Sequence, residues 1–235
     1  MKFVFVPGLF SDRSIVDPLK ARLETEYPGS KMMTVSSIGF KTVWGARWLI
    51  RMIIDWLSGE RRGREDDIVL IGHSAGGQII IPLIDDSIVR AVISICPPGH
   101  NPLDYPLKVW AVQSLYTIQT VFNQLFCIKE KHRAELFGGV LPEYMKALSY
   151  GWFALQMSMG VLLGNFRAKT KAWNKFLAFW SDGDPTIKPE VVMDMSIRHH
   201  GSGVGIKCSH HYPIIVPECL DVIVAEIKTF LLRLE

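Results

Sequence analysis

The residues best suited to chemistry form one short motif, Gly72-His73-Ser74-Ala75-Gly76. An apolar, strand-like run precedes it and a helix-like segment follows, so the serine is expected on a sharp strand-to-helix turn. Such a turn strains the backbone at the serine, and side chains in place of the flanking glycines would collide with the strand and the helix. The turn directs the serine hydroxyl and the next N–H toward one point, where a helix N-terminus favours negative charge. The motif therefore predicts a nucleophilic serine beside an oxyanion site.

This motif resembles the nucleophile elbow of the α/β-hydrolase superfamily, and three further loops carry the same resemblance. The first is Pro7-Gly8-Leu9-Phe10, which follows the first apolar segment and resembles the oxyanion loop of that family, with Pro7 in place of its histidine. In the family, the residue after this glycine donates its backbone N–H. The resemblance thus implies a substrate-binding oxyanion hole formed by Leu9 and Ala75.

The second loop, residues 181–187, resembles the family's loop that carries the catalytic acid, with Ser181 where glycine is common. Its register implies Asp184 as the acid and leaves Asp182 as the alternative. The third loop, residues 209–213, resembles the family's histidine loop, in which an aromatic residue and proline follow the histidine. That register implies His211, whereas the spacing to the last helix would suit His210.

The resemblance implies a Ser74–Asp184–His211 triad, and this order along the chain is that of the family. His211 would accept the proton of Ser74, and Asp184 would orient the imidazole, so that an acyl-enzyme forms and water releases it. The implied activity is a serine hydrolase that cleaves carboxylic esters of apolar, small-to-medium substrates, without a cofactor. A thioesterase, a lactonase, a C–C hydrolase, a hydroxynitrile lyase and a non-catalytic ligand receptor remain alternatives on the same fold.

The elements that would position these residues alternate along the chain. Strands are predicted at residues 2–6, 32–36, 68–71, 91–95, 176–180 and, more weakly, 204–208. Helices are predicted through Leu19 and Leu23 and at residues 43–57, 77–85 and 217–234. This alternation predicts an α/β fold with a mostly parallel sheet of about six strands flanked by helices. Its strands would place the three candidate catalytic residues at the carboxyl edge of the sheet.

Residues 97–171 break the alternation, because they contain no convincing strand and are rich in aromatic and aliphatic side chains. We expect a helical cap, or lid, inserted into a core formed by residues 1–96 and 172–235. Such a cap would be self-packed, would form an apolar substrate pocket, or both. A large apolar face on it would favour a homodimer.

Composition excludes several classes of protein. The net charge is only +3, and the densest basic cluster, residues 61–64, is followed at once by three acidic residues, so no nucleic-acid partner is expected. Residues 149–164 carry no charge but are shorter than a membrane-spanning helix, so no membrane contact is expected. The first apolar run is too short for a signal peptide, and the four cysteines form no CxxC pair, so a cytoplasmic location is expected.

One cluster offers a rival chemistry. Five potential metal ligands lie within thirteen positions: His199, His200, Cys208, His210 and His211. Imidazole and thiolate suit zinc or copper, but the spacing matches no established zinc motif. No metal site is expected, and His73 is expected to be structural or to form a wall of the site.

Overall fold

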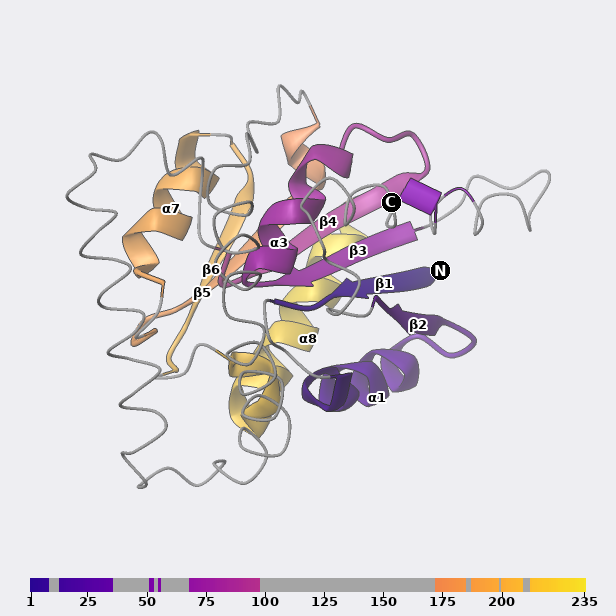
Figure 1. Ribbon diagram of the computed structural model, residues 1–235, viewed down its shortest axis with the longest axis horizontal. Helices are drawn as coiled ribbons and strands as arrows, with labels where there is room; N and C mark the ends of the chain where they lie inside the picture. Colours follow the sequence, from indigo (N-terminus) through magenta and orange to yellow (C-terminus); the bar gives the residue numbers. More distant parts are fainter. Residues whose placement is uncertain are drawn as a thin grey trace, which may run out of the picture.

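The computed structural model describes residues 1–8, 13–35, 51, 52, 55, 68–97, 172–184, 187–198, 200–208 and 212–235. The described residues form a six-stranded sheet in which every neighbouring pair is parallel, with the order β2-β1-β3-β4-β5-β6 (Figure 1). The strands are β1 (Lys2–Val6), β2 (Lys31–Thr34), β3 (Ile68–His73), β4 (Val89–Ile95), β5 (Phe176–Ser181) and β6 (Ser202–Ile206). The predicted parallel sheet of about six strands is confirmed.

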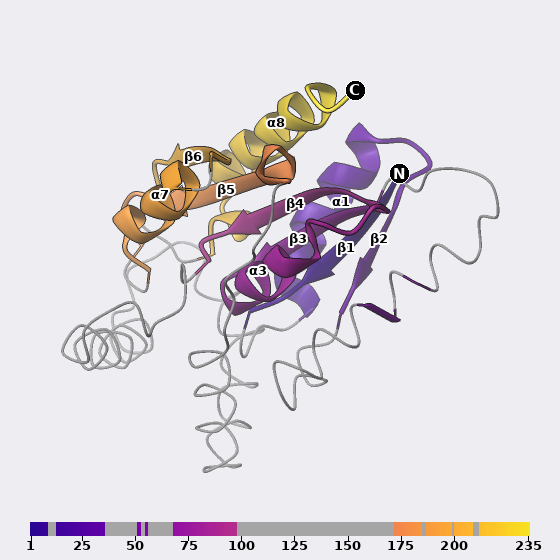
Figure 2. The ribbon, with the colours of Figure 1, turned by 90° about the horizontal axis from the view of Figure 1, so that it is seen from above.

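Helices cover both faces of this sheet (Figures 1 and 2). On one face lie α1 (Asp17–Glu26) and α8 (Pro217–Leu232), and on the other lie α3 (Ala75–Ile80) and α7 (Pro189–Arg198). Within the described residues, short 3-10 turns link the elements: η1 (Arg13–Val16), η3 (Ile81–Leu83), η5 (Trp173–Lys175) and η6 (Pro213–Ile215).

Because side chains alternate along each strand, the strands contribute to two separate hydrophobic cores, one on each face of the sheet. Phe3 and Phe5 of β1 pack in the core shared with α1 and α8, whereas Val4 and Val6 pack in the core shared with α3 and α7. Because successive strand residues point to opposite faces, a sheet covered on both sides needs apolar residues at every position. This explains why the strands are continuous apolar runs rather than alternating ones.

Several boundaries differ from those predicted. β2 and β6 begin one and two residues earlier than expected, and the predicted helix at 77–85 is divided into α3 and η3. No helix was predicted at the position of α7. Most of the predicted helix at 43–57 lies outside the described residues, as does the proposed cap, of which only Pro97 is described.

The order of the strands creates a switch point at β1. The chain passes from β1 to β2 on one side and then returns to place β3 on the other side of β1, after which β4, β5 and β6 follow in sequence. In open α/β sheets, ligands bind at the carboxyl edge of the strands near such a point. The ends of β1, β3, β4 and β5 are therefore neighbours at one edge.

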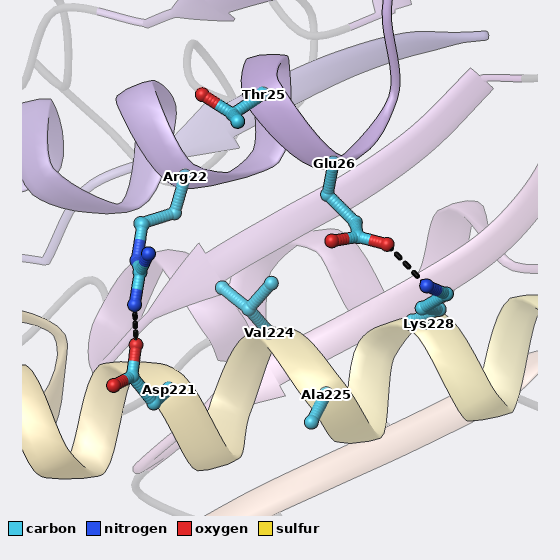
Figure 3. A pocket seen from close by; sticks show the side chains of 7 residues that line it. All are labelled: Arg22, Thr25, Glu26, Asp221, Val224, Ala225 and Lys228. Carbon is cyan, nitrogen blue, oxygen red and sulfur yellow. Dashed lines mark hydrogen bonds and ion pairs between the residues drawn. The ribbon is translucent and has the colours of Figure 1, made fainter.

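A groove of about 290 Å³ lies between α1 and α8 (Figure 3). Ion pairs between Arg22 and Asp221 and between Glu26 and Lys228 cross it. No candidate site residue lines this groove, and its side chains come from the outer helical layer. Among the helices of the described residues, none combines the length and apolarity needed to cross a membrane.

Candidate active site

Ser74 stands at the junction of β3 and α3 in a strained backbone conformation. Its φ is 51° and its ψ is −125°, a region that residues other than glycine rarely occupy, at a typical cost of about 1–3 kcal/mol. Two backbone hydrogen bonds hold the turn: the Ser74 N–H donates to the Ile95 carbonyl at 2.8 Å, and the Gln78 N–H donates to the Ser74 carbonyl at 3.2 Å. The serine is therefore fixed between the end of β4 and the first turn of α3.

The two glycines of the motif are required by close backbone approach. A Cβ at Gly72 would lie 2.6 Å from backbone atoms of Gly76 and Gly77, and a Cβ at Gly76 would lie 2.1 Å from the Val6 carbonyl oxygen. Real Cβ atoms essentially never come within 3.0 Å of such atoms. This agrees with the prediction from the sequence, and it shows that the end of β1 supports the turn as well.

The Pro7-Gly8 turn after β1 lies directly against the serine. A Cβ at Gly8 would be 2.9 Å from the Ser74 Cβ and 3.2 Å from Nδ1 of His73. Ala75, the first residue of α3, is buried beside this contact. The structure thus brings together the two loops from which an oxyanion hole was expected, although Leu9 itself lies outside the described residues.

Burial distinguishes the two carboxyl groups that follow β5. Asp184 is 7% exposed, whereas Asp182 is an exposed residue. The Asp184 N–H donates to the Ser181 carbonyl at 3.1 Å, and Asp184 Oδ1 accepts the Ile187 N–H at 2.9 Å. The backbone of Asp184 is therefore bonded to Ser181 on one side, and its carboxylate is bonded to the Ile187 N–H on the other.

Backbone hydrogen bonds continue across the sheet beyond the ends of the strands. The Cys96 N–H donates to the Phe179 carbonyl at 2.8 Å, the Asp182 N–H donates to the Ile206 carbonyl at 2.9 Å, and the Gly183 N–H donates to the Cys208 carbonyl at 2.9 Å. Cys96 and Asp182 are thus held by the next strand along the sheet, and Gly183 is held by the segment that follows β6. This lateral bonding fixes the relative positions of the loops after β3, β4 and β5.

A buried thiol adjoins the acid loop. Cys96 follows β4 at a φ of 47°, and its Sγ lies 3.6 Å from Oγ of Ser181. Burial raises the pKa of the Cys96 thiol well above its usual range, and the Asp184 carboxylate raises it further, so the thiol stays protonated. Cys96 belongs to no motif of the sequence, because only the pairing of β4 with β5 brings it to the acid loop.

The candidate histidines, His210 and His211, lie outside the described residues. Tyr212, the residue after His211, is buried, and its ring packs on the ring of His73 with 4.7 Å between the centroids. His73 precedes Ser74, so Tyr212 contacts the residue next to the predicted nucleophile. His73 is itself buried.

The residues of the rival metal site are only partly described. His200 is exposed and Cys208 is half-buried, while His199, His210 and His211 lie outside the described residues. Within the part of the chain that the structure describes, no three histidine, cysteine or acidic side chains are grouped as metal ligands.

Comparisons with known proteins place this geometry in a known fold. No family model matches the sequence, and no curated protein matches it either. Many solved structures are similar over almost the whole chain, and three of them are described here. A carboxylesterase of the thaumarchaeon Nitrososphaera gargenis has a TM-score of 0.66 at 12% identity, covering 97% of this chain and 90% of that one. A hydrolase from Oleispira antarctica has a TM-score of 0.65 at 14% identity, covering 98% and 90%.

The third, a monoacylglycerol lipase of Paleococcus ferrophilus, has a TM-score of 0.61 at 16% identity and covers 100% of this chain and 95% of that one. At these identities the similarity is one of fold. With its six parallel strands, two helical layers and a strained serine after β3, the chain has the α/β-hydrolase fold.

Proposed function

We propose that the chain is a serine hydrolase that cleaves carboxylic esters of small-to-medium apolar substrates through an acyl-enzyme, with Ser74 as the nucleophile. The observation that carries the proposal is the strained Ser74 between β3 and α3, with the Pro7-Gly8 turn packed against it. Backbone strain of this kind persists only where the surroundings enforce it, and it is concentrated at functional sites. A carboxylesterase and a monoacylglycerol lipase among the similar structures support a carboxylic ester as the substrate.

Asp184 is the proposed acid of the triad. It is buried at the carboxyl end of β5, at the same sheet edge as Ser74, and Asp182 is exposed. A buried carboxylate can orient a histidine and stabilise its charged form, whereas a solvated one does so weakly. Burial therefore favours Asp184 over Asp182.

His211 is the proposed general base. The packing of Tyr212 on His73 joins the histidine loop to the residue that precedes the nucleophile. Adjacent Cα atoms are separated by about 3.8 Å, so the chain has little length in which to leave this contact. The connection favours His211, one bond from the packed tyrosine, over His210.

The oxyanion of the tetrahedral intermediate would be bound by the N–H groups of Ala75 and Leu9. Ala75 begins α3, so its N–H belongs to the unsatisfied donors at the start of a helix. The contact of Gly8 with Ser74 supports the participation of the following residue. Each such donor typically contributes about 10²–10³-fold to the rate.

The test is hydrolysis of a series of p-nitrophenyl esters, from acetate to long acyl chains, by the wild-type protein and by Ser74→Ala. We expect the wild-type protein to turn over the short and medium esters and Ser74→Ala to fall to the background rate, a loss of roughly 10⁴-fold or more. Ser196→Ala is the matched control, because the hydroxyl of Ser196 only bonds to the Val192 carbonyl within α7.

Labelling with a fluorophosphonate separates the nucleophile from the substrate class. Labelling that Ser74→Ala abolishes and Ser196→Ala retains, with no ester turnover at any acyl length, would support the nucleophile and overturn the ester assignment. Thioesters and lactones would then be the next substrates. Equal turnover by the wild-type protein and Ser74→Ala would overturn the proposal entirely.

A further inference from the structure

The short helix that follows the proposed nucleophile has little stability of its own. α3 has only six residues, Ala-Gly-Gly-Gln-Ile-Ile, and two of its first three are glycine. Isolated helices shorter than about 12 residues are marginal in water, and glycine is among the least favourable residues in a helix interior. The position of α3, and with it the conformation of Ser74, therefore depends on contacts between α3 and the sheet.

The Gly77 carbonyl does not receive the hydrogen bond that a continuous α-helix would give it. In such a helix it would accept the N–H of Ile81, four residues later. Pro82 has no N–H to give to the Gln78 carbonyl, and the Ile81 N–H donates to that carbonyl where α3 passes into η3. Gly77 is buried, and a buried carbonyl without a donor is costly, so it needs a donor from outside the helix.

Ser94 of β4 supplies that donor. Its hydroxyl donates to the Gly77 carbonyl at 2.8 Å, and Ser94 is 0% exposed. The fit is close, because an added Cβ at Gly77 would lie 3.3 Å from the Ser94 Cβ and 3.0 Å from the Gly72 carbonyl oxygen. Ser94 is also in register with Gly72 across the pair of β3 and β4. The hydroxyl therefore ties the first turn of α3 to β4, beside the start of the serine turn.

The next residue of β4 holds the serine itself. The Ser74 N–H donates to the Ile95 carbonyl at 2.8 Å. Two consecutive residues of β4 thus bond to the nucleophile and to the helix that follows it, Ile95 through its backbone and Ser94 through its side chain. A strained conformation such as that of Ser74 persists only where several contacts enforce it, and these two come from one strand.

We infer that Ser94 is a positioning residue for the proposed nucleophile. Its hydroxyl holds α3 against β4, which keeps Ser74 in its strained conformation and the Ala75 N–H in a fixed place. The inference rests on the proposed function, in which Ser74 attacks the ester and Ala75 binds the oxyanion. Ser94 acts through Gly77 and takes no part in the bond-breaking steps.

The substitution Ser94→Ala tests this directly, because it removes the hydroxyl and keeps the Cβ that packs on Gly77. We expect kcat for a p-nitrophenyl ester to fall roughly 5- to 50-fold, since a displacement of about 1 Å in a site can cost about 10²-fold. KM should stay within about twofold, because the alignment matters in the transition state more than in substrate binding. Ser94→Cys places a weaker donor there, and we expect it to recover part of kcat.

Ser196→Ala is the matched control. Ser196 is also a buried serine whose hydroxyl donates to a helix carbonyl, that of Val192 at 3.1 Å, but this bond lies within α7. The control thus removes the same kind of bond away from the serine turn, and we expect it to keep the wild-type kcat. If Ser94→Ala matches Ser196→Ala in kcat and in the rate of fluorophosphonate labelling, the positioning role is overturned, even where Ser74→Ala shows that the proposed function stands.

Hydrogen exchange followed by mass spectrometry is independent of turnover and separates this inference from the proposed function. We expect peptides that cover residues 75–81 to exchange at least about fivefold faster in Ser94→Ala than in the wild-type protein, and those of α7 to be unchanged. Ser196→Ala should show the reverse. Unchanged exchange at residues 75–81 would overturn the inference. Faster exchange there, in a protein whose wild-type form neither hydrolyses esters nor takes the label at Ser74, would place the failure in the proposed function.

Discussion

At the scale of single residues, two carboxyl groups two positions apart have opposite environments. Asp184 is enclosed by the backbone of its own loop, while Asp182 is exposed to solvent. An exposed carboxylate is screened by water, so it interacts weakly with a nearby imidazolium. Substituting each of the two aspartates in turn therefore compares a buried carboxylate with an exposed one in the same loop.

We expect Asp184→Asn to lower kcat for ester hydrolysis by roughly 10³–10⁴-fold, because the amide neither stabilises an imidazolium nor selects its tautomer. Asp182→Asn should stay within about threefold of the wild-type rate, as surface substitutions away from the site do. Steady-state kinetics of both variants with one p-nitrophenyl ester show which of the two aspartates is the catalytic acid. A larger loss in Asp182→Asn would assign the acid to that residue instead.

Ser74 and Asp184 could be named as candidates from the sequence because each belongs to a short local pattern, a glycine-flanked turn and an acidic loop after a strand. Cys96 belongs to no local pattern. Its position beside the acid loop depends on the pairing of Ile95 with Phe179, which brings together residues far apart along the chain. The same holds for the packing of Tyr212 on His73, which a linear reading of the motifs does not reveal.

At the scale of elements, the junction between β3 and α3 is held by close packing of backbone on backbone. The start of α3 touches the end of β1 at Gly76, where the space for a Cβ is absent. Gly29, in the turn before β2, is a different case. Its φ is 82°, and no atom lies within 4 Å of the position of an added Cβ.

These two glycines predict two different costs of substitution by alanine. Gly29→Ala should cost about 1–2 kcal/mol, the strain of a left-handed alanine. Gly76→Ala should cost more than about 4 kcal/mol, because either β1 or α3 must move. Urea unfolding followed by circular dichroism measures both. Similar unfolding midpoints for the two variants would show that the turn adjusts far more readily than the backbone contacts indicate.

The elements that were predicted well are those with strong local signals, and the others were decided by tertiary contacts. The weakly predicted β6 is Ser-Gly-Val-Gly-Ile, and its glycines have low strand propensity. Trp180 of β5 lies over Gly203 and Gly205, where an added Cβ would be 2.8–2.9 Å from the indole. That packing fixes the position of β6. α7 was not predicted because it lacks a clear division into polar and apolar faces. Met193 and Ile197 on its exposed side are as apolar as its buried Val192 and Met195.

At the scale of the whole molecule, stability is expected to come from the two cores and not from the ion pairs on the surface. Ile223 of α8 is fully buried against the sheet. The Arg22–Asp221 pair crosses the neighbouring groove (Figure 3), and its two side chains are about half exposed. Exposed ion pairs typically contribute 0–1 kcal/mol, because water screens them and ordering the side chains costs entropy. A buried aliphatic side chain contributes more, through transfer from water and close packing.

We therefore expect Ile223→Ala to lower the free energy of unfolding by about 2–5 kcal/mol and Arg22→Ala by less than about 1 kcal/mol. Urea titrations at low and high salt measure the free energy of unfolding of both variants. At high salt, Arg22→Ala should become as stable as the wild-type protein, because salt screens the ion pair, whereas Ile223→Ala should remain less stable. A loss above 2 kcal/mol in Arg22→Ala would show that the groove between α1 and α8 contributes to the core.

The pairing of β4 with β5 tolerates connections of very different length between the two strands. Val92 is in register with Phe176, although residues 97–171 lie between the two strands. The entropy lost on closing a connection grows only with the logarithm of its length, so each doubling costs about 0.6 kcal/mol. An eightfold longer connection thus adds about 2 kcal/mol, less than one buried isoleucine can contribute. Insertions of many lengths can therefore accumulate between these two strands, beside the site, while the sheet and both cores keep the same pairing.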